Sequence, residues 1–229
     1  MMSTEQLALV RGWDDTRVTL RRWRACPLAA VGPWALGSLA IAVVLLAATW
    51  VVASVSTPDP TVWAPTANGE WGDYAFILYR NGLVLALHAT ACVAGFMAGA
   101  SLPLVAGGYS DWWRRVHDRA GKCAMAFVGV ATLFSLCTQA YALGLQACSI
   151  ADAYGVSPEL LMVSLLAHAV PELCALFLPL AAWLLAGRRN AWDELLAATF
   201  ATTAIAVPLL LAAAAVEVWV SPHLLSFLK

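Results

Sequence analysis

Five long apolar stretches constrain the fold of this chain more than any other feature of its sequence. Each approaches or exceeds the roughly 20 residues that a helix needs to cross the hydrocarbon core of a bilayer. The chain is 62% hydrophobic and only 12% charged, whereas a soluble domain carries roughly 25% charged residues. We therefore expect five membrane-spanning helices, at about 34–55, 77–105, 122–146, 159–187 and 195–220.

These spans follow one another through short connections. We expect an all-α, polytopic bundle, because lipid requires every backbone polar group to be bonded within the protein. The bundle forms a single integral membrane domain over 34–229, after a basic leader over 1–33. Residues 53–56 offer small side chains suited to signal-peptide cleavage, but the apolar stretch before them is longer than usual for a signal and favours an uncleaved span.

The basic residues indicate the orientation of the bundle. Of the 13 lysine and arginine residues, all but Arg80 and Lys229 fall in the leader, in the connection after the second span or in the connection after the fourth. These three segments share one side of the membrane, and basic residues are enriched on the cytoplasmic side. We expect a multi-pass protein of the bacterial cytoplasmic membrane, with a cytoplasmic N-terminus and an extracytoplasmic C-terminus.

Several classes of function are excluded or disfavoured. The net charge of −1 does not suit a partner with a phosphate backbone, so we expect no nucleic acid. There is no Walker loop, GxSxG elbow or glycine-rich dinucleotide turn. The six cysteines form no CxxC pair and show no zinc spacing, so we interpret them as packing residues. We predict no cofactor and no enzyme activity.

Polar side chains inside the predicted spans are the candidate functional residues, because such groups are costly in lipid unless they find partners. His168 and Glu172 lie four residues apart in the fourth span, so they are neighbours on one helix face. Counting along each helix places most of the polar groups in the outer half of the membrane, with Glu172 near its centre. The predicted intramembrane polar cluster comprises His168, Glu172, Glu217, His88, Asn81 and Gln139.

Two readings of this cluster stay open. Buried polar residues often only hold helices together, at roughly 0.6 kcal/mol per contact. The His168/Glu172 pair could equally serve partner binding, transport or conformational coupling. Pro171 beside the pair, and Pro208 in the last span, each remove a backbone donor and predict a kink. The two histidines and two glutamates could meet as a metal site, but only their shared depth suggests one, and we predict none.

Packing and capping residues add local expectations. Gly95 and Gly99 form a GxxxG step, which lets another helix approach closely. Ser157, Pro158 and Glu159 are typical of a helix start, with serine as N-cap. Asn190, followed by acidic residues, suggests a similar start for the last span.

The motif His168-Ala-Val-Pro-Glu172, followed by an apolar run, a basic turn and Ala215-Val-Glu217 before Ser221-Pro222, resembles the C-terminal half of the stage II sporulation protein M family. Members of that family show an HGxxE-like motif in one span and an AxxE motif near the end of the next. The resemblance is strong over 160–222 and includes Asn81 at the head of the second span. It does not extend over 107–150.

This resemblance implies an integral membrane scaffold that docks other membrane or envelope proteins, including cell-envelope remodelling factors, within the lipid bilayer. Relatives also accompany peptide-export genes, so a transport, export or immunity component with an outward-facing polar cavity is the alternative. That alternative calls for a separate ATPase subunit as partner. An intramembrane metal-dependent enzyme is a third and remote reading. A homo-oligomer is compatible with each of them.

Overall fold

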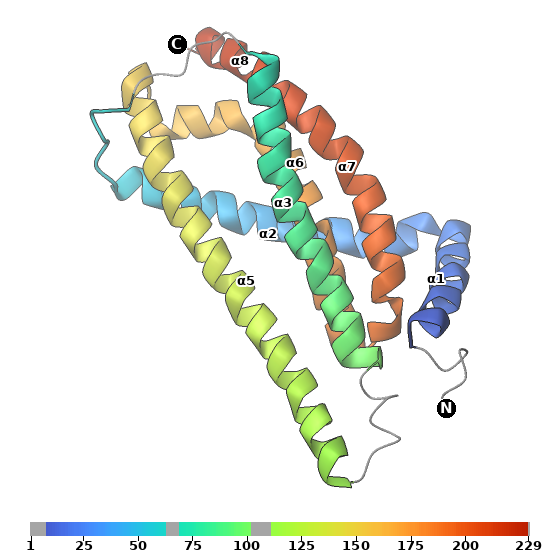
Figure 1. Ribbon diagram of the computed structural model, residues 1–229. Helices are drawn as coiled ribbons and strands as arrows, with labels where there is room; N and C mark the ends of the chain where they lie inside the picture. Colours follow the sequence, from blue (N-terminus) through green and yellow to red (C-terminus); the bar gives the residue numbers. More distant parts are fainter. Residues whose placement is uncertain (1–7, 63–68, 102–110, 229) are drawn as a thin grey trace.

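The computed structural model describes residues 8–62, 69–101 and 111–228, and Figure 1 shows these ranges to be almost entirely helical. No β-strand occurs within these ranges. The elements in chain order are α1 (Ala8–Ala25), α2 (Pro27–Val55), α3 (Trp71–Phe96), a π-helical turn η2 (Met97–Ser101), α5 (Asp111–Tyr154), α6 (Pro158–Arg189), a 3-10 turn η3 (Trp192–Glu194), α7 (Leu195–Trp219) and α8 (Ser221–Leu228).

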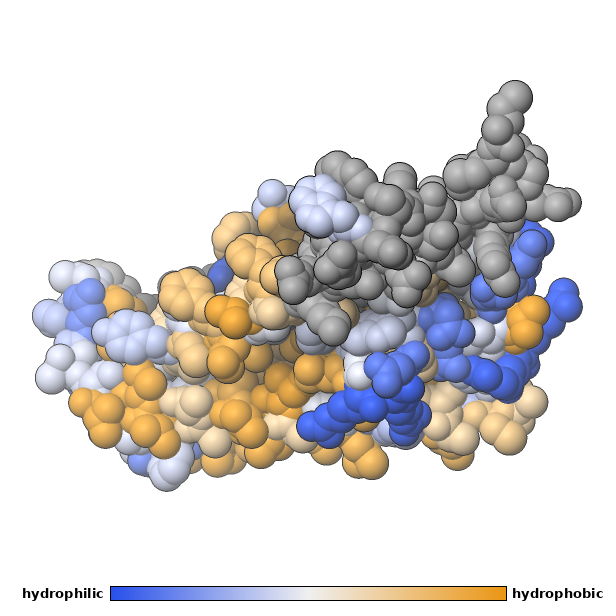
Figure 2. Space-filling model, turned by 90° about the horizontal axis from the view of Figure 1, so that it is seen from below, coloured by the Kyte–Doolittle hydropathy of each residue, from blue (hydrophilic) through white to orange (hydrophobic). Residues whose placement is uncertain are grey.

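Five of these helices are long and apolar enough to cross a membrane, which confirms the predicted number of spans. The predicted third span ended at residue 146, but α5 continues to Tyr154. The extra turns contain alanine, cysteine, serine and isoleucine and only one charge, so nothing in them stops a helix. The apolar helices give the protein an apolar surface: Figure 2 shows a broad apolar face between two more hydrophilic ends. The five apolar helices comprise Pro27–Val55, Trp71–Ala100, Met125–Tyr154, Pro158–Arg189 and Trp192–Trp219.

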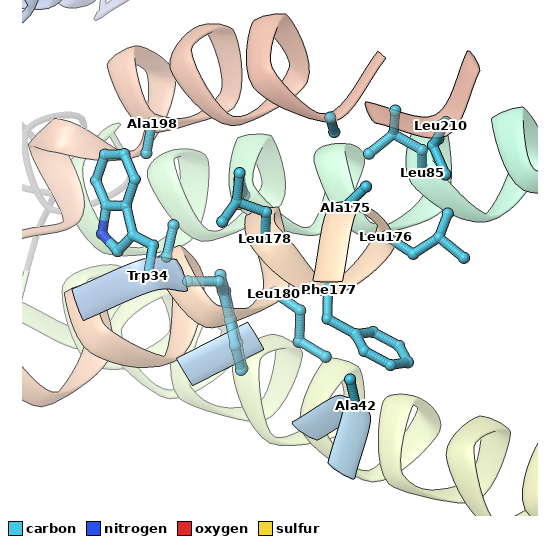
Figure 3. Packing of buried hydrophobic residues seen from close by; sticks show 14 of the residues in the cluster. Trp34, Ala42, Leu85, Ala175, Leu176, Phe177, Leu178, Leu180, Ala198 and Leu210 are labelled. Atoms are coloured by element: carbon cyan, nitrogen blue, oxygen red, sulfur yellow. The ribbon is translucent and has the colours of Figure 1, made fainter. Parts of the chain in front are cut away.

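The central helix is α6, which contacts α2, α3, α5 and α7. Every residue from 175 to 183 is buried. A helix that is apolar all round is stable when it is covered on all sides, and this stretch of α6 has that pattern. Figure 3 shows Leu178 and Phe177 of α6 among side chains of the surrounding helices, with Trp34 and Ala42 from α2 and Leu85 from α3.

Helix α5 differs from the other spans because most of its surface is uncovered. Only 6% of its spanning window is buried within the protein, against 44% for α6. Figure 1 shows α5 leaning away from the other helices toward its N-terminal end. Its C-terminal part packs on α2, where a Cβ atom at Gly144 would lie 2.8 Å from the carbonyl oxygen of Thr49. Glycine at this position therefore sets the closest approach of the two helices.

The predicted leader is folded against the bundle in its described part. Helix α1 contacts α2, α7 and η3. Arg22 forms an ion pair with Glu194, and the ring of Trp13 meets that of Phe200 edge to face, with centroids 5.8 Å apart. Gly12 lets α1 lie close to the ring of Phe96, because a Cβ atom at this position would be 2.7 Å from that ring.

One predicted helix start is confirmed and the other is wrong. Ser157 is the N-cap of α6, and its hydroxyl accepts a hydrogen bond from the backbone N–H of Leu160 at 3.3 Å. Asn190 instead ends α6, in the left-handed conformation with φ of 53°. Asparagine tolerates this conformation better than most residues, which makes it a common helix terminator. The last span begins after it, at the 3-10 turn Trp192–Glu194.

Candidate polar cavity

Three ionisable side chains converge where α6 and α7 pack together. One ring nitrogen of His168 and one carboxylate oxygen each of Glu172 and Glu217 all lie within 4.8 Å of one another. His168 and Glu172 are one turn apart on α6, and α7 brings Glu217 to them from near its C-terminal end. His168 is only 6% exposed, and both glutamates are half-buried.

Two hydrogen bonds fix members of this triad from neighbouring elements. Asn81 of α3 donates from Nδ2 to Oε1 of Glu172 at 2.8 Å. Nδ1 of His168 lies 2.6 Å from the hydroxyl oxygen of Ser221, the first residue of α8. Four elements, α3, α6, α7 and α8, therefore contribute polar atoms to one connected group. Glu172 and His168 each have further hydrogen-bonding atoms that these two bonds do not use.

The triad lines a cavity of about 450 Å³. The cavity lies between the C-terminal parts of α2, α5 and α7 and the N-terminal half of α6, and Pro222 of α8 also borders it. Most of its wall is apolar, so its few polar groups stand out against an apolar lining, as is usual for small-molecule and ion sites. The polar lining residues are Thr49, Gln146, Tyr154, Ser164, His168, Glu172, Glu217 and Ser221.

Thr49 is unusual among these lining residues. It is 4% exposed, and its hydroxyl oxygen has no hydrogen-bond partner among the residues that the structure describes. Thr202 shows the ordinary behaviour of a buried threonine in a helix, because its hydroxyl donates to the carbonyl of Ala198 one turn earlier at 2.7 Å. A buried hydroxyl without a partner costs free energy, so the cavity is the natural source of a partner for Thr49.

The carboxylates of Glu172 and Glu217 repel each other when both are ionised, since they lie close together away from bulk water. Arg80 is the basic side chain whose charge acts on both of them. It is itself exposed and lies over the ring of Phe76, with its guanidinium carbon 5.8 Å from the ring centroid. The triad therefore has little positive charge beside it, and a shared proton or a bound cation would relieve the repulsion.

The remaining predicted cluster residues lie elsewhere. His88 is buried, and its Nδ1 atom lies 2.9 Å from the carbonyl oxygen of Leu176, one turn after Glu172 on α6. Gln139 donates to the hydroxyl of Ser135 on its own helix at 3.1 Å and does not line the cavity. The Gln139 bond is local to its helix, whereas His88 joins α3 to α6.

The packing and proline residues also have defined places. Gly95 accommodates the indole of Trp183, because a Cβ atom there would lie 2.7 Å from its Nε1, and Gly99 accommodates the side chain of Trp192. The close approach at this GxxxG step is thus made by tryptophan side chains. Pro171 lies within α6 and Pro208 within α7, and both helices continue through their prolines.

Sequence reasoning did not single out Thr49 or Ser221 as site residues. Thr49 is one hydroxyl in an apolar span, and its importance comes from the helices opposite it. Ser221-Pro222 resembles a helix start, and α8 does begin there, but the contact of Ser221 with His168 depends on where α8 packs.

All six cysteines are free thiols, and Cys92 contacts the carbonyl of Pro179 through its sulfur at 3.1 Å.

In the described part of the chain, almost every residue is helical, five helices are apolar enough to cross a membrane, and a polar cavity lies between them. These features define a polytopic α-helical membrane protein. Residues 120–222 match the family model described as Stage II sporulation protein M. Over these residues, which make up less than half of the chain, the protein is similar to that family. No curated protein and no solved structure matches the chain.

The matched range carries most of the site. It includes His168, Glu172, Glu217 and Ser221, and it begins at residue 120 within α5, a segment that the sequence resemblance did not reach. Asn81 and Thr49 lie outside it, so α2 and α3 add polar atoms to a site whose other elements belong to the family segment.

Proposed function

We propose that this protein is a non-enzymatic membrane scaffold that docks the transmembrane helices of partner proteins in the bacterial cytoplasmic membrane. The uncovered face of α5 is the observation that carries the proposal. Exposed side chains at positions 127, 130, 134, 137 and 141 follow one another at alternating steps of three and four residues. This spacing aligns them in one stripe along the helix, which we call the α5 stripe, and it is the spacing by which two helices pack side by side.

Several features of the α5 stripe suit helix docking. It presents Phe127, Val130, Phe134 and Tyr141, whose exposed fractions run from 60% to 73%. Helices in lipid associate through van der Waals packing of side chains, and the α5 stripe presents one continuous row of side chains for such packing. Only 6% of the spanning window of α5 is buried within the protein, so most of this helix is accessible to an additional helix. A family whose namesake takes part in sporulation fits a protein that works through other proteins.

The test replaces the α5 stripe and leaves the cavity untouched. In the stripe variant, Phe127, Val130 and Phe134 are changed to Ala, and partner proteins are recovered from mild detergent and identified by mass spectrometry. The matched control changes three exposed apolar residues of α2, Leu36, Val43 and Val44, to Ala as well. We expect the stripe variant to lose its partners and the control to keep them. Equal recovery with both variants would exclude docking on α5.

The polar cavity favours a second candidate, a transport or peptide-export component. A cavity of about 450 Å³ with ionisable groups between spanning helices is where a transporter binds its substrate or coupling ion. The chain carries no nucleotide-binding motif, so an ATPase would be a separate partner subunit. This candidate predicts that the cavity residues, rather than the α5 stripe, decide function, and a substrate-export assay on the stripe variant and on cavity variants separates the two.

A further inference from the structure

We infer that His168, Glu172 and Glu217 bind a divalent transition-metal ion of the zinc type at the wall of the polar cavity. This site is independent of the scaffold function proposed above, because it lies in the cavity and not on the α5 stripe. The metal would join α6 to α7 and keep one coordination position open toward the cavity.

The donor set fits such an ion. One imidazole nitrogen and two carboxylate oxygens are ligands that zinc accepts, and three protein ligands with a free fourth position are typical of zinc sites that keep an exchangeable ligand. Ligand atoms on one tetrahedral zinc ion lie about 3.4 Å apart, given bond lengths near 2.1 Å. The three donors already lie within 4.8 Å of one another, so rotations about side-chain bonds suffice to close the site.

The hydrogen bonds to His168 and Glu172 each leave one possible ligand atom free. Nδ1 of His168 is engaged by Ser221 at 2.6 Å. When this nitrogen donates its proton to the serine hydroxyl, the lone pair of Nε2 is available for a metal. Asn81 occupies Oε1 of Glu172, which leaves Oε2 as the ligand atom. Partners of this kind orient metal ligands and set the histidine tautomer in known sites.

Charge supports a cation at this position. Two carboxylates close together in a region shielded from water are unfavourable when both are ionised. A divalent ion bound to both would compensate their charge fully. The one ion pair among the described residues is Arg22 with Glu194, at the other end of α7, so the triad has no basic side chain in salt-bridge contact.

The cavity supplies the independent evidence for a ligand. Thr49 faces it from α2 with a buried hydroxyl that lacks a partner in the described part of the chain. A water molecule or the polar group of a molecule bound in the cavity would give this hydroxyl its missing partner. An arrangement built only to hold α6 and α7 together has no use for an unsatisfied hydroxyl on the opposite wall.

The test measures binding to the full-length protein in nanodiscs. After treatment with a chelator and its removal, the protein is titrated with Co²⁺ and, separately, with Zn²⁺. We expect one Co²⁺ per chain by elemental analysis, with visible absorption bands of a tetrahedral or five-coordinate site and no near-ultraviolet thiolate band. Zn²⁺ should displace the Co²⁺ and raise the melting temperature of the wild-type protein.

Variants then locate the site. Glu217→Gln and His168→Asn should abolish the visible bands and the Zn²⁺-induced rise in melting temperature, and Ser221→Ala should weaken binding by about 10- to 100-fold. Glu159→Gln, an exposed carboxylate on α6, is the control and should bind as the wild type does. Circular dichroism and gel filtration verify that each variant is folded. Wild-type binding below one ion in ten chains, a thiolate band, or unchanged binding in folded Glu217→Gln would overturn the proposal.

Discussion

Asn81 donates a hydrogen bond from Nδ2 to Oε1 of Glu172 over 2.8 Å, and so joins the first turns of α3 to the middle of α6. Both side chains are half-buried. The bond holds the carboxyl group of Glu172 at the wall of the cavity and gives it one of the few donors that this apolar region offers.

Removing that donor should lower stability modestly. Asn81→Ala is expected to cost about 1 kcal/mol, in line with hydrogen bonds between helices in membrane proteins. A double-mutant cycle with Glu172→Leu, which removes the acceptor, followed by denaturation in mixed micelles, measures the coupling between the two positions. Strictly additive effects of the two substitutions would show that the bond contributes nothing in the membrane.

Substitutions at Glu172 should separate the two candidate functions. Glu172→Gln keeps the size and most of the hydrogen bonding of the side chain but removes its charge, whereas Glu172→Leu removes both. Scaffolding through the α5 stripe predicts that Gln retains partner recovery in a pull-down. It predicts that Leu lowers recovery only as far as it lowers the amount of folded protein, because Leu leaves the amide of Asn81 unpaired. Proton-linked transport predicts that both variants lose function while still reaching the membrane in normal amounts.

Leucine at both 168 and 172 is the severe version of this experiment. If accumulation, partner recovery and cellular function all match the wild type, the pair has no part in the protein's activity.

The two GxxxG glycines should resist enlargement. Gly95→Leu drives its side chain into Trp183, and Gly99→Leu into Trp192. Overpacking of this kind costs about 1–3 kcal/mol, so we expect a melting temperature several degrees lower, or reduced accumulation. Gly82→Leu is the matched control on the same helix, because a Cβ atom at Gly82 meets nothing within 4 Å. A Gly82 variant as unstable as the other two would show that helix propensity, not packing, decides the result.

Orientation can be measured by labelling single cysteines in a cysteine-free background. The distribution of basic residues predicts that a cysteine at Asp152 reacts with an impermeant reagent in intact cells, and that one at Arg189 reacts only after permeabilisation. Both positions are exposed. Labelling of the Arg189 position in intact cells would reverse the predicted topology.

Hydropathy alone was sufficient to predict the five spans, because hydrocarbon sets a minimum length and an apolar composition for each. The adjacency of His168 and Glu172 was equally accessible, since four residues make one helical turn. The meeting of this pair with Glu217 depends on how α6 and α7 rotate about their axes, which hydropathy does not encode. For the same reason His88 shared the predicted depth range but lies against the carbonyl of Leu176.

Features that depend on a third element were out of reach of the sequence. Thr49 becomes noteworthy only because α5 and α6 enclose it without offering a partner. The small buried share of α5 depends on which helices pack beside it, whereas its sequence is that of one more apolar span. Asn190 was misassigned because asparagine both starts and ends helices, and the backbone angle that distinguishes the two roles is a structural observation.

The order of elements along the chain suggests that the Asn81–Glu172 hydrogen bond can form during membrane insertion, before the other contacts of the triad. Synthesis proceeds from the N-terminus, so α3 has left the ribosome before α6 does, and α7 follows both. When α6 enters the bilayer, α7 and α8 with Glu217 and Ser221 have not yet been made. Asn81 of α3 is then already present as a hydrogen-bond partner for Glu172. The bond can therefore hold α6 against α3 in the nascent chain. Its loss should reduce the amount of protein correctly inserted more than it reduces the stability of the finished protein.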